Sequence, residues 1–214
     1  MASEDRTVAS NPGRIRVQPL RFVASNPVTA LLPVITLAVA AYGAFAWGNW
    51  LLMVLPVLST PYCALAFRIK KQKFEQGDVN VSKILSSDPP LFAVATDMQT
   101  SHGGDRHPAV KIVHGRVPAV PGIEWKAGDF FATASLYRGD VDHDRWDDFF
   151  PEPLSCATAD ADALRAHDAR LVGDRPMLDL RLSMVPRPYE PGLYWLDEEE
   201  LERLEAAGGE SATR

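Results

Sequence analysis

Residues 22–67 read FVASNPVTALLPVITLAVAAYGAFAWGNWLLMVLPVLSTPYCALAF, a run of 46 residues without Asp, Glu, Lys or Arg. About 20 apolar helical residues cross the hydrocarbon core of a bilayer, so the run has room for two spans, 28–46 and 50–67. Between them, Trp47-Gly48-Asn49-Trp50 combines turn-forming residues with two indole rings that suit a membrane–water interface. The run therefore predicts a transmembrane helical hairpin and excludes a purely soluble protein.

Basic residues flank this hairpin on both sides. Arg14, Arg16 and Arg21 precede the first span, and the connecting turn has no cation. Because cations near membrane spans favour the cytoplasmic side, we expect both termini to face the cytoplasm. Cations after the second span can also contact anionic lipid headgroups. The expected membrane-interface residues are Trp47, Trp50, Arg68, Lys70, Lys71 and Lys73.

Charge divides the chain into two parts. Residues 1–73 carry 8 basic and 2 acidic side chains, a net charge of +6, whereas residues 74–214 carry 14 basic and 26 acidic ones, a net charge of −12. A strongly acidic part argues against nucleic acid as a partner. The two cysteines, Cys63 and Cys156, form no metal-binding or disulfide pattern and are expected to be unpaired thiols.

The acidic part has the pattern of a small β-rich domain. Three apolar runs, 91–96, 109–117 and 130–137, are separated by Gly- and Pro-containing loops, which favours an antiparallel meander, a small barrel or a sandwich. Residues 72–83 are expected to be a polar connector. Residues 177–185 alternate apolar and polar side chains, as a half-buried strand does.

Two helices complete the expected α+β fold. One covers 158–171, with Thr158 or Asp160 as its cap, and one covers 198–207, with Asp197 as its cap and Gly208-Gly209 as its end. The expected domains are a mobile basic arm (1–26), a two-helix transmembrane hairpin (27–73), a cytoplasmic β-rich α+β domain (74–207) and a disordered tail (208–214).

An acidic loop holds the main candidates for chemistry. Asp142, His143 and Asp144 lie close together in the sequence, and carboxylates two residues apart can converge on a cation. The spacing of a calcium-binding loop does not follow, and no zinc-protease, nucleophile-elbow or phosphate-loop motif occurs. We therefore predict no catalytic residue, no metal and no cofactor.

The segment from Asp142 to Asp160 also carries a family-like pattern. It runs D-x-D-x-W-x4-P-x-P-x3-A-T-x-D, with Trp146, Pro151 and Pro153 at its centre. Downstream of an apolar hairpin, this pattern resembles an uncharacterised actinobacterial membrane protein family, the domain of unknown function 3239, over about residues 30–172. The resemblance implies membrane anchoring and an actinobacterial source, and it names no reaction. From the resemblance together with the hairpin, we expect a multi-pass protein of a bacterial plasma membrane. Within the motif, Trp146 is expected to be a core anchor, and Trp125 is expected to lie in a loop.

Two classes of function are compatible with these features. The first is a membrane-tethered cytoplasmic interaction module, an accessory or regulatory subunit of a membrane or cell-envelope complex, with the bilayer and an unidentified protein as partners. The alternative is an inner-leaflet enzyme that acts on lipid or cell-envelope precursors through the acidic loop. The interaction candidates are Asp142, His143, Asp144, Trp146, Pro151 and Pro153. The sequence does not define the oligomeric state.

Overall fold

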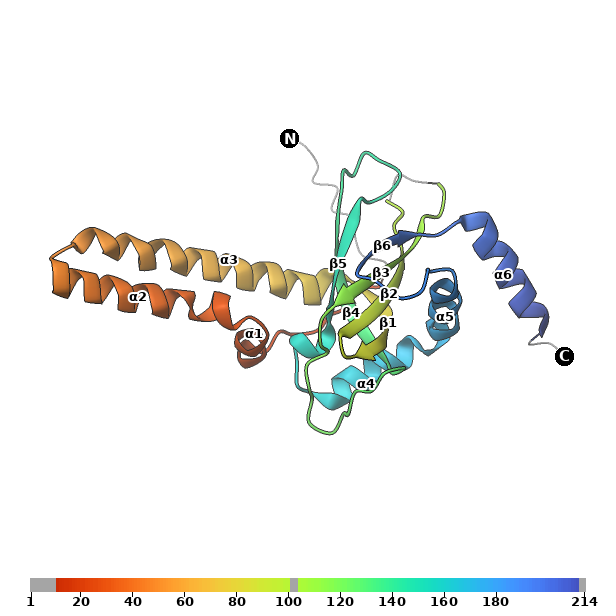
Figure 1. Cartoon of the computed structure of the whole chain (residues 1–214), viewed down its shortest axis with the longest axis horizontal. Coiled ribbons are helices and arrows are strands. Elements are labelled where there is room, and N and C mark those ends of the chain that lie inside the picture. The colour runs from red at the N-terminus through yellow and green to blue at the C-terminus, as the bar shows by residue number, and fades with distance from the viewer. Residues whose placement is uncertain (1–10, 101–103, 212–214) are drawn as a thin grey trace.

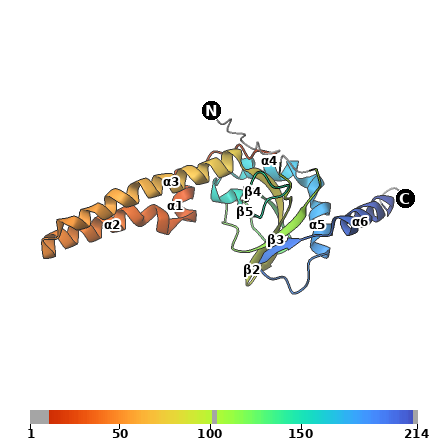
Figure 2. The ribbon, with the colours of Figure 1, turned by 90° about the horizontal axis from the view of Figure 1, so that it is seen from above.

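The structure is a computed structural model that describes residues 11–100 and 104–211. A pair of long helices projects from one side of a mixed helix-and-sheet domain, and a last helix lies at the opposite side (Figure 1; from above in Figure 2). The α+β class expected from the sequence is confirmed.

The long helices are α2 (Pro27–Trp47) and α3 (Val54–Gln76), joined by Gly48, Asn49 and a 3-10 turn over Trp50–Met53. They lie side by side in both views. Gly43 makes room for the connecting turn, because a Cβ there would lie 2.2 Å from Leu52 Cδ1. The hydroxyls of Thr36 and Ser59 are 2.8 Å apart across the pair.

The helical pair leaves most of its apolar surface uncovered. Within the described residues, the stretch Trp50–Gln76 is long and apolar enough to cross a membrane, and 6% of its apolar window is buried. The described apolar part of α2, Leu31–Trp47, is shorter. Burial inside a protein core is the usual reason for an apolar helix in a soluble protein, and it does not apply here. This surface indicates membrane association.

Residues 11–25 do not form the expected mobile arm. Ile15 and Val17 are buried in the main core, and Ile15 N donates to Phe74 O at 3.1 Å. The chain then forms α1 (Pro19–Ser25), whose Phe22 ring meets the Phe67 ring edge-on at 5.0 Å. Alternating apolar residues explain this packing, since Ile15 and Val17 point to the core while Arg14 and Arg16 are exposed. Residues 1–10 of the expected arm lie outside the described part.

The sheet has six antiparallel strands in the order β5-β4-β1-β2-β3-β6. The three expected strands are confirmed as β2 (Pro90–Asp97), β3 (Pro108–His114) and β4 (Phe130–Arg138). The other three are β1 (Asp78–Ser87), β5 (Asp148–Pro153) and β6 (Gly192–Trp195). The expected polar connector over 72–83 is wrong, because α3 continues to Gln76 and β1 starts at Asp78.

The sheet curls until its two ends approach each other. Lys111 on β3 bonds Asp148 Oδ1 on β5 at 2.6 Å, although three strands lie between them. Just before β5, the Arg145 guanidinium lies 4.6 Å from the centre of the Trp195 ring on β6. The curled sheet encloses a second, smaller core that includes Phe92, Met98, Phe131 and Phe149.

Helices cover the outer face of the sheet. They are α4 (Ala161–Arg170) and α5 (Arg175–Ser183), with 3-10 turns over Leu154–Cys156 and Val172–Asp174. The strand expected over 177–185 is wrong: Leu178, Leu182 and Val185 recur at helical spacing and are buried in the main core. At the C-terminus, α6 (Glu198–Ser211) begins as expected, with Asp197 Oδ1 accepting from Glu200 N at 3.0 Å. It continues past Gly208-Gly209, where the sequence predicted a disordered tail.

Candidate functional site

The inside of the curled sheet carries a buried polar layer on β1 and β4. Ser82 and Thr133 are paired through their hydroxyls at 2.9 Å, and Asn80 Nδ2 donates to Ser135 Oγ at 3.1 Å. Alternate residues of neighbouring strands share a face, so the sequence places these four side chains together once the register is set.

This layer continues to the end of the sheet where β1 starts and β2 ends. The hydroxyls of Thr96 and Tyr137 are 2.7 Å apart, and Tyr137 donates to Asp78 Oδ2 at 3.2 Å. Burial, reinforced by the Asp78 charge, raises the pKa of the Tyr137 phenol well above its ordinary value. Tyr137 is therefore a neutral hydrogen-bond donor at physiological pH.

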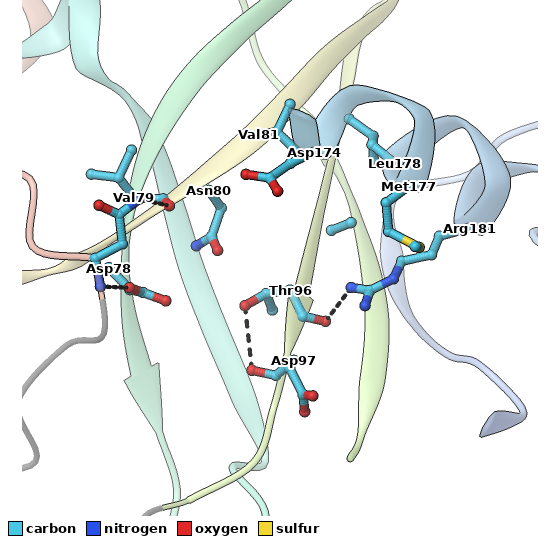
Figure 3. A pocket seen from close by; sticks show the side chains of 12 residues that line it. Asp78, Val79, Asn80, Val81, Thr96, Asp97, Asp174, Met177, Leu178 and Arg181 are labelled. Atoms are coloured by element: carbon cyan, nitrogen blue, oxygen red, sulfur yellow. Dashed lines mark hydrogen bonds between the residues drawn. The ribbon is translucent and has the colours of Figure 1, made fainter. Parts of the chain in front are cut away.

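A cavity of about 320 Å³ lies at this end of the sheet, between its strands and α5 (Figure 3). Arg181 extends from α5 into its lining, with 7% of its surface exposed, and Nη1 donates to Thr96 O at 3.1 Å. Burial first, and Arg106 second, lower the pKa of Arg181, while Asp97, Glu205 and Asp174 oppose that shift. A guanidinium nevertheless stays charged in proteins. The cavity is lined by Asn11, Asp78, Val79, Asn80, Val81, Ala95, Thr96, Asp97, Asp174, Met177, Leu178 and Arg181.

The acidic loop that the sequence singled out lies elsewhere and is exposed. Asp142, His143 and Asp144 line no part of this cavity, and the backbone oxygens of His143 and Asp144 accept hydrogen bonds from Thr100. The Asp144 carboxylate also lies 3.6 Å from His107 Nε2. Among the described residues, no group of three or more His, Cys, Asp and Glu side chains could hold a metal ion. The loop fixes the end of β2 to the segment that precedes β5.

The remaining motif residues have structural surroundings. Trp146 is half-buried and stacks on Tyr137 with ring centres 6.1 Å apart. Pro151 and Pro153 lie in β5, opposite Ser135 and Thr133 of β4. Because β5 is an end strand, proline nitrogens there remove no ladder hydrogen bond that a central strand would need.

The expected membrane-interface residues divide into two groups. Trp47 and Trp50 lie at the far tip of the helical pair and are 72% and 70% exposed. At the other end, Lys70 and Lys73 both pair with Glu152 of β5, the latter at 3.2 Å. Arg68 and Lys71 are exposed, and Lys71 has a long contact of 3.9 Å with Glu75. Lys70 and Lys73 thus bind the sheet domain, which the sequence did not predict.

Both cysteines are free, as expected. Cys63 lies on α3, and Cys156 is buried beside the Glu152 pair. Burial, with a smaller contribution from Glu152, raises the pKa of the Cys156 thiol to about 12. A thiol that stays protonated is a poor nucleophile, so this residue does not provide a reactive centre.

Arg181 and its cavity were not predicted from the sequence. Alternation over 177–185 assigned Arg181 to the polar face of a strand, where an arginine is unremarkable. The signal that could have found it is helical spacing, because Arg181 lies on the same helix face as the buried Leu178 and Leu182. A charge within an apolar helical stripe is unusual enough to suggest a function or a buried partner.

Comparisons with known proteins give one distant match. Neither a protein-family model nor a curated protein sequence matches the chain. A solved structure described as "a putative membrane protein from Corynebacterium diphtheriae" is similar over 56% of this chain and 100% of that chain, with 19% sequence identity and a TM-score of 0.39. A similarity at this level carries no argument about fold or activity. The resemblance to the domain of unknown function 3239 therefore stays a prediction.

Proposed function

We propose that the protein is a membrane-tethered interaction module, in which two transmembrane helices hold the sheet domain at a fixed orientation against the cytoplasmic face. In this role it is an accessory or regulatory subunit of a membrane or cell-envelope complex. The observation that carries the proposal is the direct, multiply bonded junction between α3 and the sheet.

The junction leaves no room for a flexible linker. Gly77 alone separates α3 from β1, and it is buried. A Cβ on Gly77 would lie 2.3 Å from Lys73 O and 2.7 Å from Ser135 O. The end of the helix and the middle of the sheet therefore touch through their backbones, which sets the angle between the anchor and the domain.

Two further contacts brace this junction. The pairs of Lys70 and Lys73 with Glu152 connect the last turns of α3 to β5. The N-terminal segment crosses from the anchor to the domain, with Gln18 N bonded to Ala157 O at 2.8 Å. The Gly77 junction, the Glu152 pairs and the N-terminal segment thus give three independent connections. A simple tether does not need them, whereas a domain that presents one surface to a membrane partner needs a fixed orientation.

Charge supports the proposed orientation. Arg14 N bonds Glu75 O, so the N-terminal arginines lie beside the same end of α3 as Arg68 and Lys71. The opposite tip of the helical pair carries Trp47 and Trp50 and no cation. Concentration of the cations at the domain end favours a cytoplasmic domain.

An inserted linker tests the proposal. A five-residue Gly/Ser insertion after Gln76 keeps the anchor and the domain but frees their relative orientation. In native membranes, we expect cross-linking to yield a stoichiometric complex with the wild-type chain and at least about tenfold less with the insertion. The matched control is the same insertion after Lys126, in an exposed turn.

Two results would contradict the proposal. Equal yields of the complex from the wild-type chain and the insertion after Gln76 would show that orientation is unimportant. A chain that is cross-linked to no specific partner in its native membrane would contradict the interaction role itself.

A further inference from the structure

Arg181 lies at one end of the cavity beneath α5, and most of its N–H donors have no hydrogen-bond partner among the described residues. We call this end of the cavity and the opposite end its two poles. Arg181 is more than nine-tenths buried, and its side chain makes one hydrogen bond in the described part of the chain, from Nη1 to Thr96 O. Its Nε is buried without a partner. A guanidinium is a planar fork of several N–H donors that matches a carboxylate, and unmade bonds of a buried charged group are costly.

A carboxylate occupies the opposite end of the cavity. In Figure 3, the Asp174 carboxylate faces the space between the sheet and α5, across from the Arg181 guanidinium. Asp174 lies immediately before α5, and its side chain does not cap that helix. Asn80, which lines the cavity on β1, turns its amide to the inner layer, where Nδ2 donates to Ser135 Oγ.

The two acids farther along the lining are already engaged. Asp78 accepts from Asn11 N at 2.9 Å and from Tyr137. Asp97 Oδ1 accepts from Gln99 N and His107 N, at 3.1 Å and 2.8 Å. Their charges still act on the cavity: Asp97 and Asp174 both favour the charged form of Arg181.

These charges exclude the simplest ligands. An anion alone would satisfy Arg181 but meet the negative charge of Asp174, and a cation alone would satisfy Asp174 but meet Arg181. A molecule that carries both charges satisfies each pole. Between the poles, Val81, Met177 and Leu178 line the cavity, and they suit a short apolar side chain. The volume of about 320 Å³ is at the small end of the range for ligand sites.

We propose that this cavity binds a small zwitterion of the α-amino acid class, with its carboxylate on Arg181 and its ammonium on Asp174. The proposal goes beyond the interaction role and does not depend on it, because the purified full chain suffices for the test.

Binding to the detergent-solubilised full chain is measured by calorimetry and by thermal shift, with L-alanine, L-leucine and L-lysine as probes. At least one of them is expected to bind and to raise the melting temperature. Acetate and methylammonium, which each carry one of the two charges, are expected to bind at least about tenfold more weakly, since each loses one charged hydrogen-bonding pole.

Substitutions at the two poles locate the site. Arg181→Met is expected to abolish binding, and Asp174→Asn to weaken it at least about tenfold. The matched controls are Arg165→Met and Asp162→Asn, an exposed pair on α4 with a contact of 3.0 Å, which should bind as the wild type does. Met177→Trp fills the cavity without removing a charge, and it should also abolish binding if Arg181→Met fails to fold.

Three results would overturn the proposal. They are the absence of binding for all three amino acids at millimolar concentration, equal affinity for acetate and for the best amino acid, and retained binding in both Asp174→Asn and Met177→Trp.

Discussion

Phe149 lies where the two ends of the curled sheet meet. It is completely buried in the inner core, its ring centre is 6.0 Å from that of Tyr137, and its backbone oxygen accepts from Lys111. Phe149→Ala is therefore expected to lower the free energy of unfolding of the sheet domain by about 3–5 kcal/mol. Denaturant unfolding followed by tryptophan fluorescence measures this. Phe150 is 42% exposed, and Phe150→Ala should cost less than about 1 kcal/mol; equal costs would show that the ends of the sheet do not meet at Phe149.

Asp168 gives the stability a defined pH dependence. Burial raises the pKa of its carboxyl to about 6, while the Ala132 N–H and the Arg175 cation act in the opposite direction. An acid with a raised pKa in the folded state loses stability as the pH rises from about 4 through about 6, because the fold disfavours its charged form. Asp168→Asn should therefore gain about 1–2 kcal/mol at pH 7.5 and little at pH 4. Melting temperatures at these two pH values test this, and a loss at pH 7.5 would contradict it.

The two tryptophans of the inner core show a limit of sequence reasoning at this scale. The motif around Trp146 predicted a core anchor, and Trp125 was expected to lie in a loop of little consequence. Both are half-buried on the same cluster, with Trp125 Nε1 bonded to Pro118 O at 3.2 Å. The residues next to a tryptophan in the sequence do not show which loop folds over the inner core. For the same reason, the sequence did not distinguish the buried Phe149 from the exposed Phe150.

At the scale of elements, sequence patterns predicted the wrong structure for α5 and did not predict β5. Residues 177–185 fit both a period of two and a helical period, and Pro176 in the first turn of α5 favours the helix. In β5, Pro151 and Pro153 are unfavourable for a central strand, but an end strand tolerates them. Apolar runs predicted three of the four inner strands, β2, β3 and β4, whereas the central strand β1 was missed because its first half was assigned to a polar connector. Such runs could not reveal which segments would become the edges of the sheet.

The segment before α1 is a structural element rather than an arm. Ile15 is 5% exposed in the main core, so Ile15→Ala should cost about 2–4 kcal/mol of stability. Leu20, which is 85% exposed, is the control, and Leu20→Ala should change the stability of the purified protein by less than about 0.5 kcal/mol. A mobile arm would make both substitutions neutral in thermal unfolding.

Glu152 connects an element of the anchor to an element of the domain. Its carboxylate is largely buried between Lys70 and Lys73, and Glu152→Gln would remove the negative charge from between these two cations and turn an NH2 group toward one of them. We expect a loss of about 1–3 kcal/mol in thermal unfolding. Glu75→Gln removes only the long, exposed contact with Lys71 and should cost less than about 0.5 kcal/mol. Equal costs would contradict the role of Glu152 as a brace.

For the whole molecule, the sequence predicts a division into an apolar helical pair and an acidic α+β part. It did not define how these parts join. The boundary placed near residue 73 separates Phe74 and the N-terminal Ile15 and Val17 from the core that they complete. Contacts between residues so far apart depend on the register of the finished sheet, which local patterns do not encode. The Arg181 cavity was missed for the same reason, because its lining comes from β1, β2, α5 and the N-terminal segment.

The orientation in the membrane is the prediction with the widest consequence. If both helices cross the bilayer and the cations stay inside, Asn49 in the tip of the pair faces the outside. Asn49→Cys should then react with an impermeant maleimide on intact cells, whereas Ser183→Cys, at the exposed end of α5, should react only after permeabilisation. Cys63→Ala serves as the background for both, because the remaining native thiol, Cys156, is buried and protonated. Labelling of Ser183→Cys on intact cells would invert the topology, and labelling of both positions there would show that the helices lie on the outer surface rather than across the membrane.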